Sequence, residues 1–199
     1  MSDLARFWPA WLDGSVRTRL EEAYADSSRG YHDLLHLTEV LQHVDELMPP
    51  DHPARETVLL AAWFHDAVYD GRGDDEERSA RLAEATVPDP VVASEVARLV
   101  RLTWTHRPSS DDLGGQVLCD ADLAVLAADP DRYASYVAGV RAENARVSDA
   151  DFAAGRAAGL RALLAKPTLF HTDAGRSRWE QSARANVRRE IEDPTGPGG

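Results

Sequence analysis

The chain has 199 residues, with 34 acidic and 22 basic side chains and a net charge of -12 at pH 7. This length and a hydrophobic content of 43% fit one soluble globular domain with a full core. Phosphate backbones require basic surfaces, so the acidic balance argues against a nucleic-acid partner. No apolar run approaches the roughly 20 residues that span a bilayer, and no signal peptide is evident. We therefore expect a cytoplasmic protein without a membrane partner.

Cysteine and lysine each occur only once in the sequence, which excludes further classes of functional site. Cys119 is the only cysteine, which excludes an internal disulfide and a cysteine-based metal cluster. Lys166 is the only lysine, which excludes a Gly-Lys-Ser/Thr phosphate loop. The sequence around Lys166 is typical of a helix C-terminus, where cations are commonly placed.

Apolar residues recur at three- and four-residue spacings through most of the chain, which predicts an all-α fold. Asp89-Pro90 and Ser148 with Asp151 mark two helix starts. Residues 105–116 form the longest predicted loop and are expected to shape a pocket mouth. Without an interdomain linker, residues 1–192 are predicted to form one domain and 193–199 a disordered tail. In chain order, the predicted helices are 9–26, 33–47, 53–69, 74–86, 89–105, 116–128, 130–146, 149–165 and 174–191.

A histidine and an aspartate adjoin inside an apolar stretch, at His65-Asp66 within residues 59–69. Wrapped as a helix, this stretch is apolar nearly all the way round, which predicts that it is buried. A buried carboxylate without a partner is costly, and a paired charge or a metal ion is the usual compensation. The adjacent imidazole supplies part of it. A divalent cation held by both side chains would need further ligands elsewhere in the chain.

A second polar intrusion consists of Asp120 and Asp122, within the apolar segment 117–126. On a helix these two side chains point about 200° apart, so they cannot share one role. One is expected to face the core, and the other to face a loop or cap a helix. For Asp120, capping of the following helix is an equal alternative. Asp122 has apolar neighbours on both sides, which weakens that interpretation for it.

A third cluster lies at residues 31–43 and contains three histidines. His36 lies among leucines and a valine, so we expect it to point inward. For His43 we prefer an ordinary core or surface role. His106 ends a predicted helix, where it either complements the helix dipole or reaches a site.

One histidine, the His-Asp pair and a later aspartate therefore arise on three separate predicted helices. Nitrogen and carboxylate ligands without sulfur suit Mn, Fe, Co, Ni, Mg or Zn and do not single one out. Four protein ligands leave positions in an octahedral shell for water and a substrate oxygen. Metal-assisted hydrolysis requires such an arrangement.

The pattern resembles the HD superfamily of metal-dependent phosphohydrolases, whose signature is H…HD…D. The resemblance covers about residues 28 to 190. Within the superfamily, the chain is similar to a subgroup of predicted phosphohydrolases whose substrate is generally unassigned. That subgroup often has Asp-Asn-Glu where this chain has Asp74-Asp75-Glu76, which adds a negative charge here. The matching motifs are Tyr31-His32-x-x-x-His36, Trp63 to Asp70, Asp75-Glu76-x-x-Ser79-Ala80 and Asp120-Ala121-Asp122-Leu123.

The resemblance implies an all-α, single-domain HD-type helical bundle with a central metal site. The implied ligands of one divalent ion are His36, His65, Asp66 and Asp122. In related enzymes the ligand is usually the second acid of an Asp-x-Asp pair, which selects Asp122 and leaves Asp120 as a supporting or capping residue. The implied activity is hydrolysis of a small phosphorylated substrate, such as a nucleotide, by metal-activated water.

Asp70 and Glu76 are the candidate acid-base residues, because both follow Asp66 closely enough to orient water. The ordinary alternatives are a turn residue for Asp70 and a solvated first helical turn for residues 74–77. Substrate phosphate would need cations, although most helix arginines form surface pairs. The candidate arginines are Arg78, Arg141, Arg156 and Arg184.

Two alternatives remain open from the sequence. An HD-type di-iron oxygenase would hold a second metal, with His32, Glu39, His43 and His106 as candidates; the lack of a clear second cluster disfavours it. A non-catalytic, nucleotide-binding HD domain is disfavoured by the intact ligand set.

Overall fold

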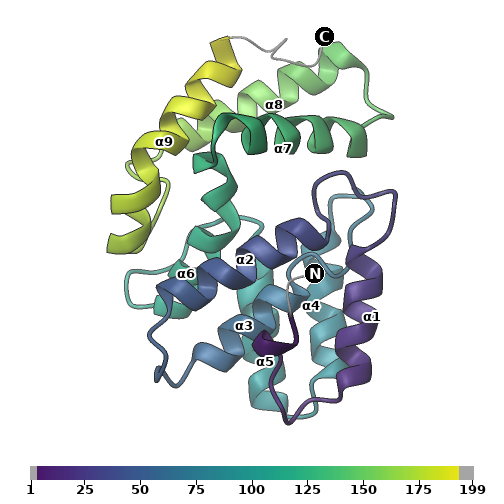
Figure 1. The fold of residues 1–199 in the computed structure, drawn as a ribbon. Helices are drawn as coiled ribbons and strands as arrows, with labels where there is room; N and C mark the ends of the chain where they lie inside the picture. Colours follow the sequence, from purple (N-terminus) through teal and green to yellow (C-terminus); the bar gives the residue numbers. More distant parts are fainter. Residues whose placement is uncertain (1–3, 193–199) are drawn as a thin grey trace.

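The computed structural model describes residues 4–192, and this part of the chain contains helices and turns but no strand (Figure 1). The predicted all-α fold is therefore confirmed. The predicted tail at 193–199 lies outside the described residues, as do residues 1–3. The elements are η1 Leu4–Phe7, α1 Gly14–Tyr24, α2 Leu34–Leu47, α3 Arg55–Phe64, α4 Asp75–Thr86, α5 Pro90–Leu102, α6 Leu113–Leu123, η2 Ala124–Ala127, α7 Pro130–Glu143, α8 Asp149–Leu164 and α9 Asp173–Glu192.

The helices form two groups (Figure 1). Helices α1 to α5 occupy the lower part of this view, and α7 to α9 lie above them. Helix α6 continues through η2 into the upper group. Each group has its own apolar cluster: one is built mainly from α1 to α6, and the other from α7 to α9 together with Tyr31. None of the helices between residues 4 and 192 is long and apolar enough to cross a bilayer.

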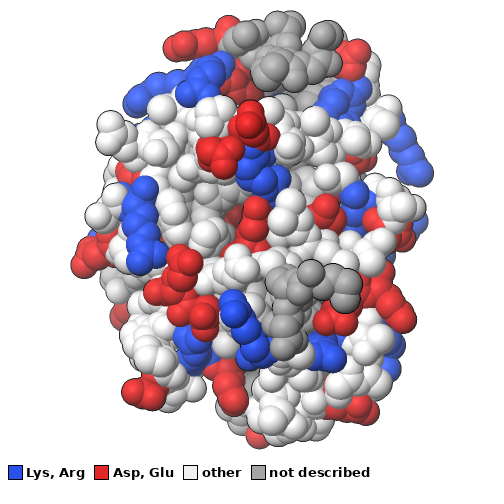
Figure 2. Space-filling model, viewed as in Figure 1, with Lys and Arg blue, Asp and Glu red and all other residues white. Residues whose placement is uncertain are grey.

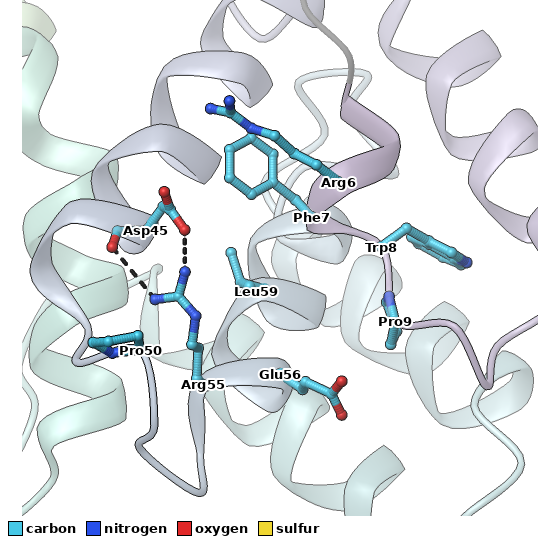
Figure 3. A pocket seen from close by; sticks show the side chains of 9 residues that line it. All are labelled: Arg6, Phe7, Trp8, Pro9, Asp45, Pro50, Arg55, Glu56 and Leu59. Atoms are coloured by element: carbon cyan, nitrogen blue, oxygen red, sulfur yellow. Dashed lines mark hydrogen bonds and ion pairs between the residues drawn. The ribbon is translucent and has the colours of Figure 1, made fainter.

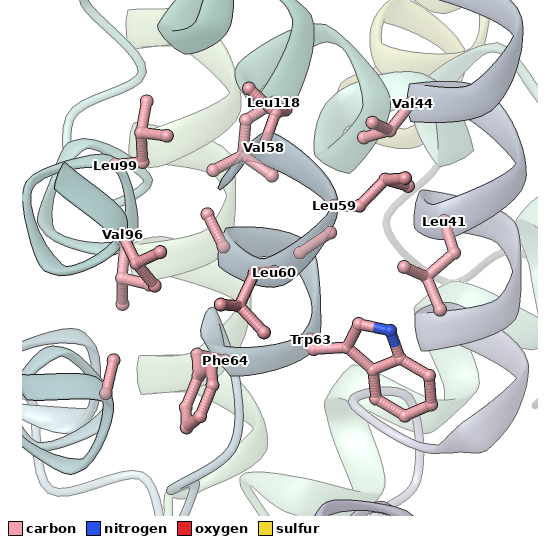
Figure 4. Packing of buried hydrophobic residues seen from close by; sticks show 14 of the residues in the cluster. Leu41, Val44, Val58, Leu59, Leu60, Trp63, Phe64, Val96, Leu99 and Leu118 are labelled. Carbon is pink, nitrogen blue, oxygen red and sulfur yellow. The ribbon is translucent and has the colours of Figure 1, made fainter. Parts of the chain in front are cut away.

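Helix α3 is the centre of the larger cluster. Its residues 58–64 are all buried, as the apolar run predicts. Figure 4 shows Leu60, Trp63 and Phe64 of α3 between side chains of α2, α5 and α6. Each large side chain buried in this way contributes about 1.5–3 kcal/mol relative to an exposed one. The end of α3 is therefore held firmly at the middle of the lower group.

Helix starts follow the expected capping chemistry. The Asp89 side chain accepts hydrogen bonds from the backbone N–H groups of Val91 and Val92, with Pro90 in the first turn. The Ser148 hydroxyl accepts from the N–H of Asp151, which confirms that predicted start. Local sequence therefore sets these boundaries.

Five predicted helices differ from the observed ones by three or more residues at an end. Two of them, at 89–105 and 130–146, end three residues early, at Leu102 and Glu143. The predicted helix at 9–26 starts only at Gly14, after the Asp13 cap. The predicted helix at 53–69 ends at Phe64, so His65 and Asp66 lie in the turn that follows and not inside a helix. The predicted helix at 116–128 starts at Leu113 and tightens into η2; because α5 ends at Leu102, the loop between them lies at 103–112 instead of 106–115.

Charged side chains are interspersed on the face shown in Figure 2. Arg101 on α5, for example, pairs with Glu77 and Glu84 on α4 at 2.6 and 2.8 Å. Exposed pairs of this kind contribute about 0.2–1 kcal/mol each. These pairs complement the contact between α4 and α5. The face of the described chain in Figure 2 shows no broad basic surface.

The two groups touch closely where Gly139 of α7 faces Gly30, just before α2. A Cβ on either glycine would overlap the backbone of the other. The backbone at 30–32 therefore rests directly against α7.

We predict opposite effects for alanine at two helical glycines. Gly139→Ala should lower the free energy of unfolding by about 1–3 kcal/mol, because the new methyl group overlaps the Gly30 backbone. Gly155→Ala on α8 meets open space and should raise it by about 0.5–1 kcal/mol through helix propensity. Urea unfolding of both variants tests this pair, and equal effects would contradict the close approach.

Candidate metal centre

His36 lies in the first turn of α2, where the Asp33 side chain caps the helix. The Asp33 carboxylate accepts hydrogen bonds from the N–H groups of Leu35 and His36 at 2.9 and 3.1 Å. The His36 ring packs against Tyr31, with ring centroids 4.6 Å apart, and is only 1% exposed. The cap and this aromatic contact direct the imidazole inward, as the sequence predicts.

His65 and Asp66 are held by the turn after α3. The Asp66 N–H donates to the Tyr24 hydroxyl at 3.1 Å. Arg29 donates to the carbonyls of Asp66 and Ala67 at 2.7 and 3.1 Å. Buried backbone groups need such partners once a helix ends. Tyr24 and Arg29 thus hold the backbone of the pair in place at the end of α3.

Asp120 and Asp122 project from α6 to opposite sides, as their spacing predicts. Asp120 accepts hydrogen bonds from the N–H groups of His171 and Thr172 at 2.7 and 2.8 Å. It therefore fastens α6 to the start of α9 and does not cap the helix that follows α6. Asp122 points instead toward His36 and His65.

The structure brings His36, His65, Asp66 and Asp122 together. The Nε2 atoms of His36 and His65 are 3.1 Å apart. Asp66 Oδ2 lies 3.0 Å from His65 Nε2 and 3.4 Å from His36 Nε2. Asp122 Oδ1 lies 3.3 and 3.9 Å from the same two nitrogens. The two histidines and Asp66 form the tightest group, with Asp122 at its edge.

The distances among His36, His65 and Asp66 fit ligands that share one divalent ion, whereas Asp122 Oδ1, 3.9 Å from His65 Nε2, lies outside this group. Donor atoms at about 2.1 Å from a metal are about 3.0 Å apart as octahedral neighbours and about 3.4 Å apart in a tetrahedron. The Ala62 carbonyl accepts a hydrogen bond from His65 Nδ1 at 2.7 Å, so that nitrogen carries a proton. In neutral His65 the Nε2 lone pair therefore faces the cluster. A backbone carbonyl often orients a metal-binding histidine in this way.

The cluster is electrostatically coupled. Burial alone would lower the pKa of His36, but its contacts with Asp122 and Asp66 raise it to about 9. Burial alone would raise the pKa of Asp66, but the charges of His65 and His32 hold it well below its usual value. Without a cation, the two carboxylates thus favour the protonated form of His36. A divalent cation also supplies positive charge and competes with that proton.

The two candidate acid-base residues have different surroundings. Asp70 is exposed and pairs with Arg72 and Arg78 at 3.1 and 2.9 Å. Glu76 is half-buried, and its side chain makes no hydrogen bond or ion pair to another residue of the described chain. Burial raises its pKa, and the charges of Asp66 and other nearby carboxylates raise it further. The Glu76 carboxyl group therefore has no side-chain partner in the described chain, and its pKa is affected by the charges of the cluster.

The four candidate arginines are all engaged within the fold. Arg78 pairs with Asp70, and Arg141 pairs with Asp149 while donating to backbone carbonyls. Arg156 pairs with Glu190 at 2.8 Å and donates to the Tyr136 hydroxyl. Arg184 pairs with Glu180 and donates to the carbonyls of residues 164, 166 and 167. As placed, these side chains hold helices and turns together.

The residues considered for a second metal do not form a second cluster in the described chain. Glu39 forms a two-pronged ion pair with Arg132 at 2.7 and 2.6 Å. His43 packs on Trp179, with ring centroids 4.9 Å apart. His32 bonds to Glu143, and His106 bonds to Asp122.

Glu143 at the end of α7 is a supporting residue that sequence reasoning missed. One of its oxygens accepts hydrogen bonds from the backbone N–H groups of residues 30, 31 and 32 at 2.9, 2.9 and 3.0 Å. Its other oxygen lies 2.8 Å from His32 Nδ1. Glu143, Tyr24 and Arg29 carry no metal-ligand pattern, and their contacts cross 37 to 113 residues of sequence. No local signal in the sequence identifies them.

A pocket of about 400 Å³ lies elsewhere, between η1, the end of α2 and the start of α3 (Figure 3). Arg55 pairs with Asp45 across one side, and Trp8 and Pro9 line another. None of the four clustered residues lines it. The cluster instead reaches solvent through its carboxylates, since the side chains of Asp66 and Asp122 are 13% and 16% exposed.

Comparison of the chain with protein-family models, with characterised proteins and with solved structures gave no match.

We predict that Glu143→Gln destabilises the protein in a pH-dependent way. Burial raises the Glu143 pKa, but the hydrogen bonds from His32 and the adjacent backbone lower it to about 2. Its stabilising effect is present above the unfolded pKa of about 4.5 and is lost as pH falls toward about 2. The variant should lose about 2 kcal/mol near pH 7, with the difference shrinking below about pH 4.5.

Urea unfolding of wild type and variant between pH 3 and 7 measures this difference. Glu192→Gln, on the exposed end of α9, is the control and should change little. A loss for Glu143→Gln that is independent of pH would contradict the assigned role of the Glu143 charge.

Proposed function

We propose that this protein is a divalent-metal-dependent phosphohydrolase that acts in the cytoplasm on a small phosphate ester, such as a nucleotide. The observation that carries the proposal is the meeting of two imidazoles and two carboxylates at ligand-like spacing. The H…HD…D resemblance adds the expected chemistry to that geometry. The metal is drawn from Mn, Fe, Co, Ni, Mg or Zn, since this donor set does not select among them.

His36, His65, Asp66 and Asp122 would hold the ion. When bound there, it supplies a Lewis acid that polarises a phosphoryl oxygen and lowers the pKa of water. Both histidines are buried and both carboxylates reach solvent, so substrate would approach from the carboxylate side. The surrounding apolar side chains exclude bulk water from the opposite side, which strengthens charge interactions at the centre.

Glu76 is the better supported acid-base residue. Its half-buried side chain has no hydrogen-bond or ion-pair partner in another described residue, and its pKa is raised first by burial and then by the charges of Asp66, Asp75 and Asp122. In hydrolysis it would accept the proton of the attacking water as the new P–O bond forms. The ester P–O bond then breaks, and the leaving alcohol takes a proton from solvent or from protonated Glu76. Asp70, bound to two arginines, is better suited to holding the turn.

The two alternatives have less support. A di-iron oxygenase needs further ligands beside the first metal, and Glu39 and His43 are engaged elsewhere. A non-catalytic nucleotide-binding domain would not need a complete ligand set together with a free, buried carboxyl group.

We predict that Asp66→Ala and Asp66→Asn abolish bound metal and phosphatase activity together, because the tightest ligand group is broken. Elemental analysis gives the metal content, and a phosphatase screen with Mn, Co, Ni, Mg, Fe and Zn gives the activity. His43→Gln is the control, because His43 lies on Trp179, and should keep both. An Asp66 variant that remains folded, metal-replete and active would refute the proposed centre.

We predict that Glu76 and Asp70 variants separate acid-base chemistry from turn stability. Glu76→Gln should lower kcat by about 10²–10⁴-fold while leaving bound metal unchanged, because proton transfer is lost but the ligands remain. Asp70→Asn should keep kcat within a few-fold and mainly lower the thermal midpoint. Steady-state kinetics and metal content decide this, and the reverse order of effects would make Asp70 the acid-base residue.

A further inference from the structure

Asp120 and Asp122 are joined by a closed circuit of hydrogen bonds that leaves α6 and returns to it. The Asp120 carboxylate accepts the His171 N–H at 2.7 Å. The His171 ring donates from Nε2 to the His106 carbonyl at 3.2 Å. The His106 ring then donates from Nε2 to Asp122 Oδ2 at 2.8 Å. Asp122 thus contacts the candidate metal ligands. Asp120 binds the segment that carries His171, and His171 contacts His106, which bonds to Asp122.

His106 has an unusual backbone within this circuit. Its φ is +48°, the only positive value among the described residues other than glycine. A left-handed residue with a side chain costs of order 1 kcal/mol, and such strain persists only where surrounding contacts enforce it. The loop before α6 has no glycine at this position, so the imidazole is present despite the backbone cost.

Contacts on the His106 carbonyl hold this conformation. Lys166, beyond the end of α8, donates to that carbonyl at 3.3 Å and to the Thr105 carbonyl at 3.5 Å. His171 donates to the His106 carbonyl from the other chain segment. The single lysine of the protein follows the C-terminus of α8, as the sequence predicts, and also contacts this loop. The Lys166 and His171 side chains thus hold the backbone of His106, and the His106 ring lies against Asp122.

The arrangement fixes which oxygen of Asp122 faces the cluster. Oδ2 is occupied by His106, while Oδ1 lies 3.3 Å from His36 Nε2. Without a partner on Oδ2, the carboxylate is free to rotate about its own bond or to turn both oxygens toward one ion. Groups that hydrogen-bond to metal ligands commonly change metal affinity by 10–100-fold.

We propose that His106 is a positioning residue for the metal centre: clamped by Lys166 and His171, it holds the Asp122 carboxylate so that one oxygen completes the ligand set. The proposal rests on the metal centre of the proposed function. It also explains why the Asp-x-Asp pair needs both acids, since Asp120 supports the segment that carries His171.

Co²⁺ is the probe, because its visible absorption reports affinity, stoichiometry and ligand geometry without any turnover. We compare wild type with His106→Leu, which removes the donor, and His106→Gln, which keeps an N–H at similar reach. His106→Leu should weaken Co²⁺ binding by about 10–100-fold and alter the spectrum, whereas His106→Gln should remain within a few-fold of wild type. His171→Leu should give a smaller loss of the same sign.

A purely structural role predicts a different result. It would lower the thermal midpoint of the metal-free His106→Leu protein and leave its Co²⁺ affinity unchanged well below that midpoint, which would overturn the proposal. Two ions per wild-type chain and one in His106→Leu would also overturn it, because His106 would then be a ligand. If His106→Leu loses Co²⁺ affinity and His171→Leu does not, the contact from His171 has no part in positioning His106, and that part of the proposal is overturned.

The same titration separates this inference from the proposed function. His65→Ala removes a ligand and should abolish Co²⁺ binding at the centre. If wild type and His65→Ala bind Co²⁺ alike, the metal centre itself fails. If His65→Ala loses binding and His106→Leu does not, only the positioning role fails.

Discussion

Charge compensation at one buried point is the constraint on which the rest of this structure depends. Two imidazoles and two carboxylates meet within a few ångströms, beside the end of α3, whose residues 58–64 are all buried. Such groups are stable in a protein interior only when each charge has a partner and each remaining polar atom a hydrogen bond. Helices α2, α3 and α6 pack together so that their polar ends meet there.

The supporting contacts come from distant parts of the chain. Tyr24 and Arg29 hold the turn after α3, and Glu143 holds the backbone before α2. Helices α7 to α9 are therefore part of the site even though they have their own apolar cluster. The contact between Gly30 and Gly139 brings the two groups close enough for Glu143 to reach residues 30–32.

The distribution of positive charge also bears on function. The arginines suggested for phosphate binding are committed to ion pairs and backbone carbonyls, and the protein has a net charge of -12. An anionic substrate would then be attracted mainly by the charge held at the cluster itself. Under the proposed function, a bound cation would therefore contribute to substrate affinity as well as to the chemistry.

The sequence by itself determined the all-α fold, several helix caps and the inward direction of His36, because helical periodicity and capping depend on residues a few positions apart. It also identified His36, His65 and Asp66 as polar residues within apolar segments, whereas the choice of Asp122 over Asp120 came from the family resemblance. Only the tertiary structure decided that His65 and Asp66 lie in a turn, that Asp70 faces arginines while Glu76 remains free, and that His106 bonds to Asp122. The turn at His65 and Asp66 depends on Tyr24 and Arg29, which lie 42 and 37 residues from Asp66, and His106 meets Asp122 across 16 residues. Polar groups select such partners only after the helices have packed, so no local pattern specifies them.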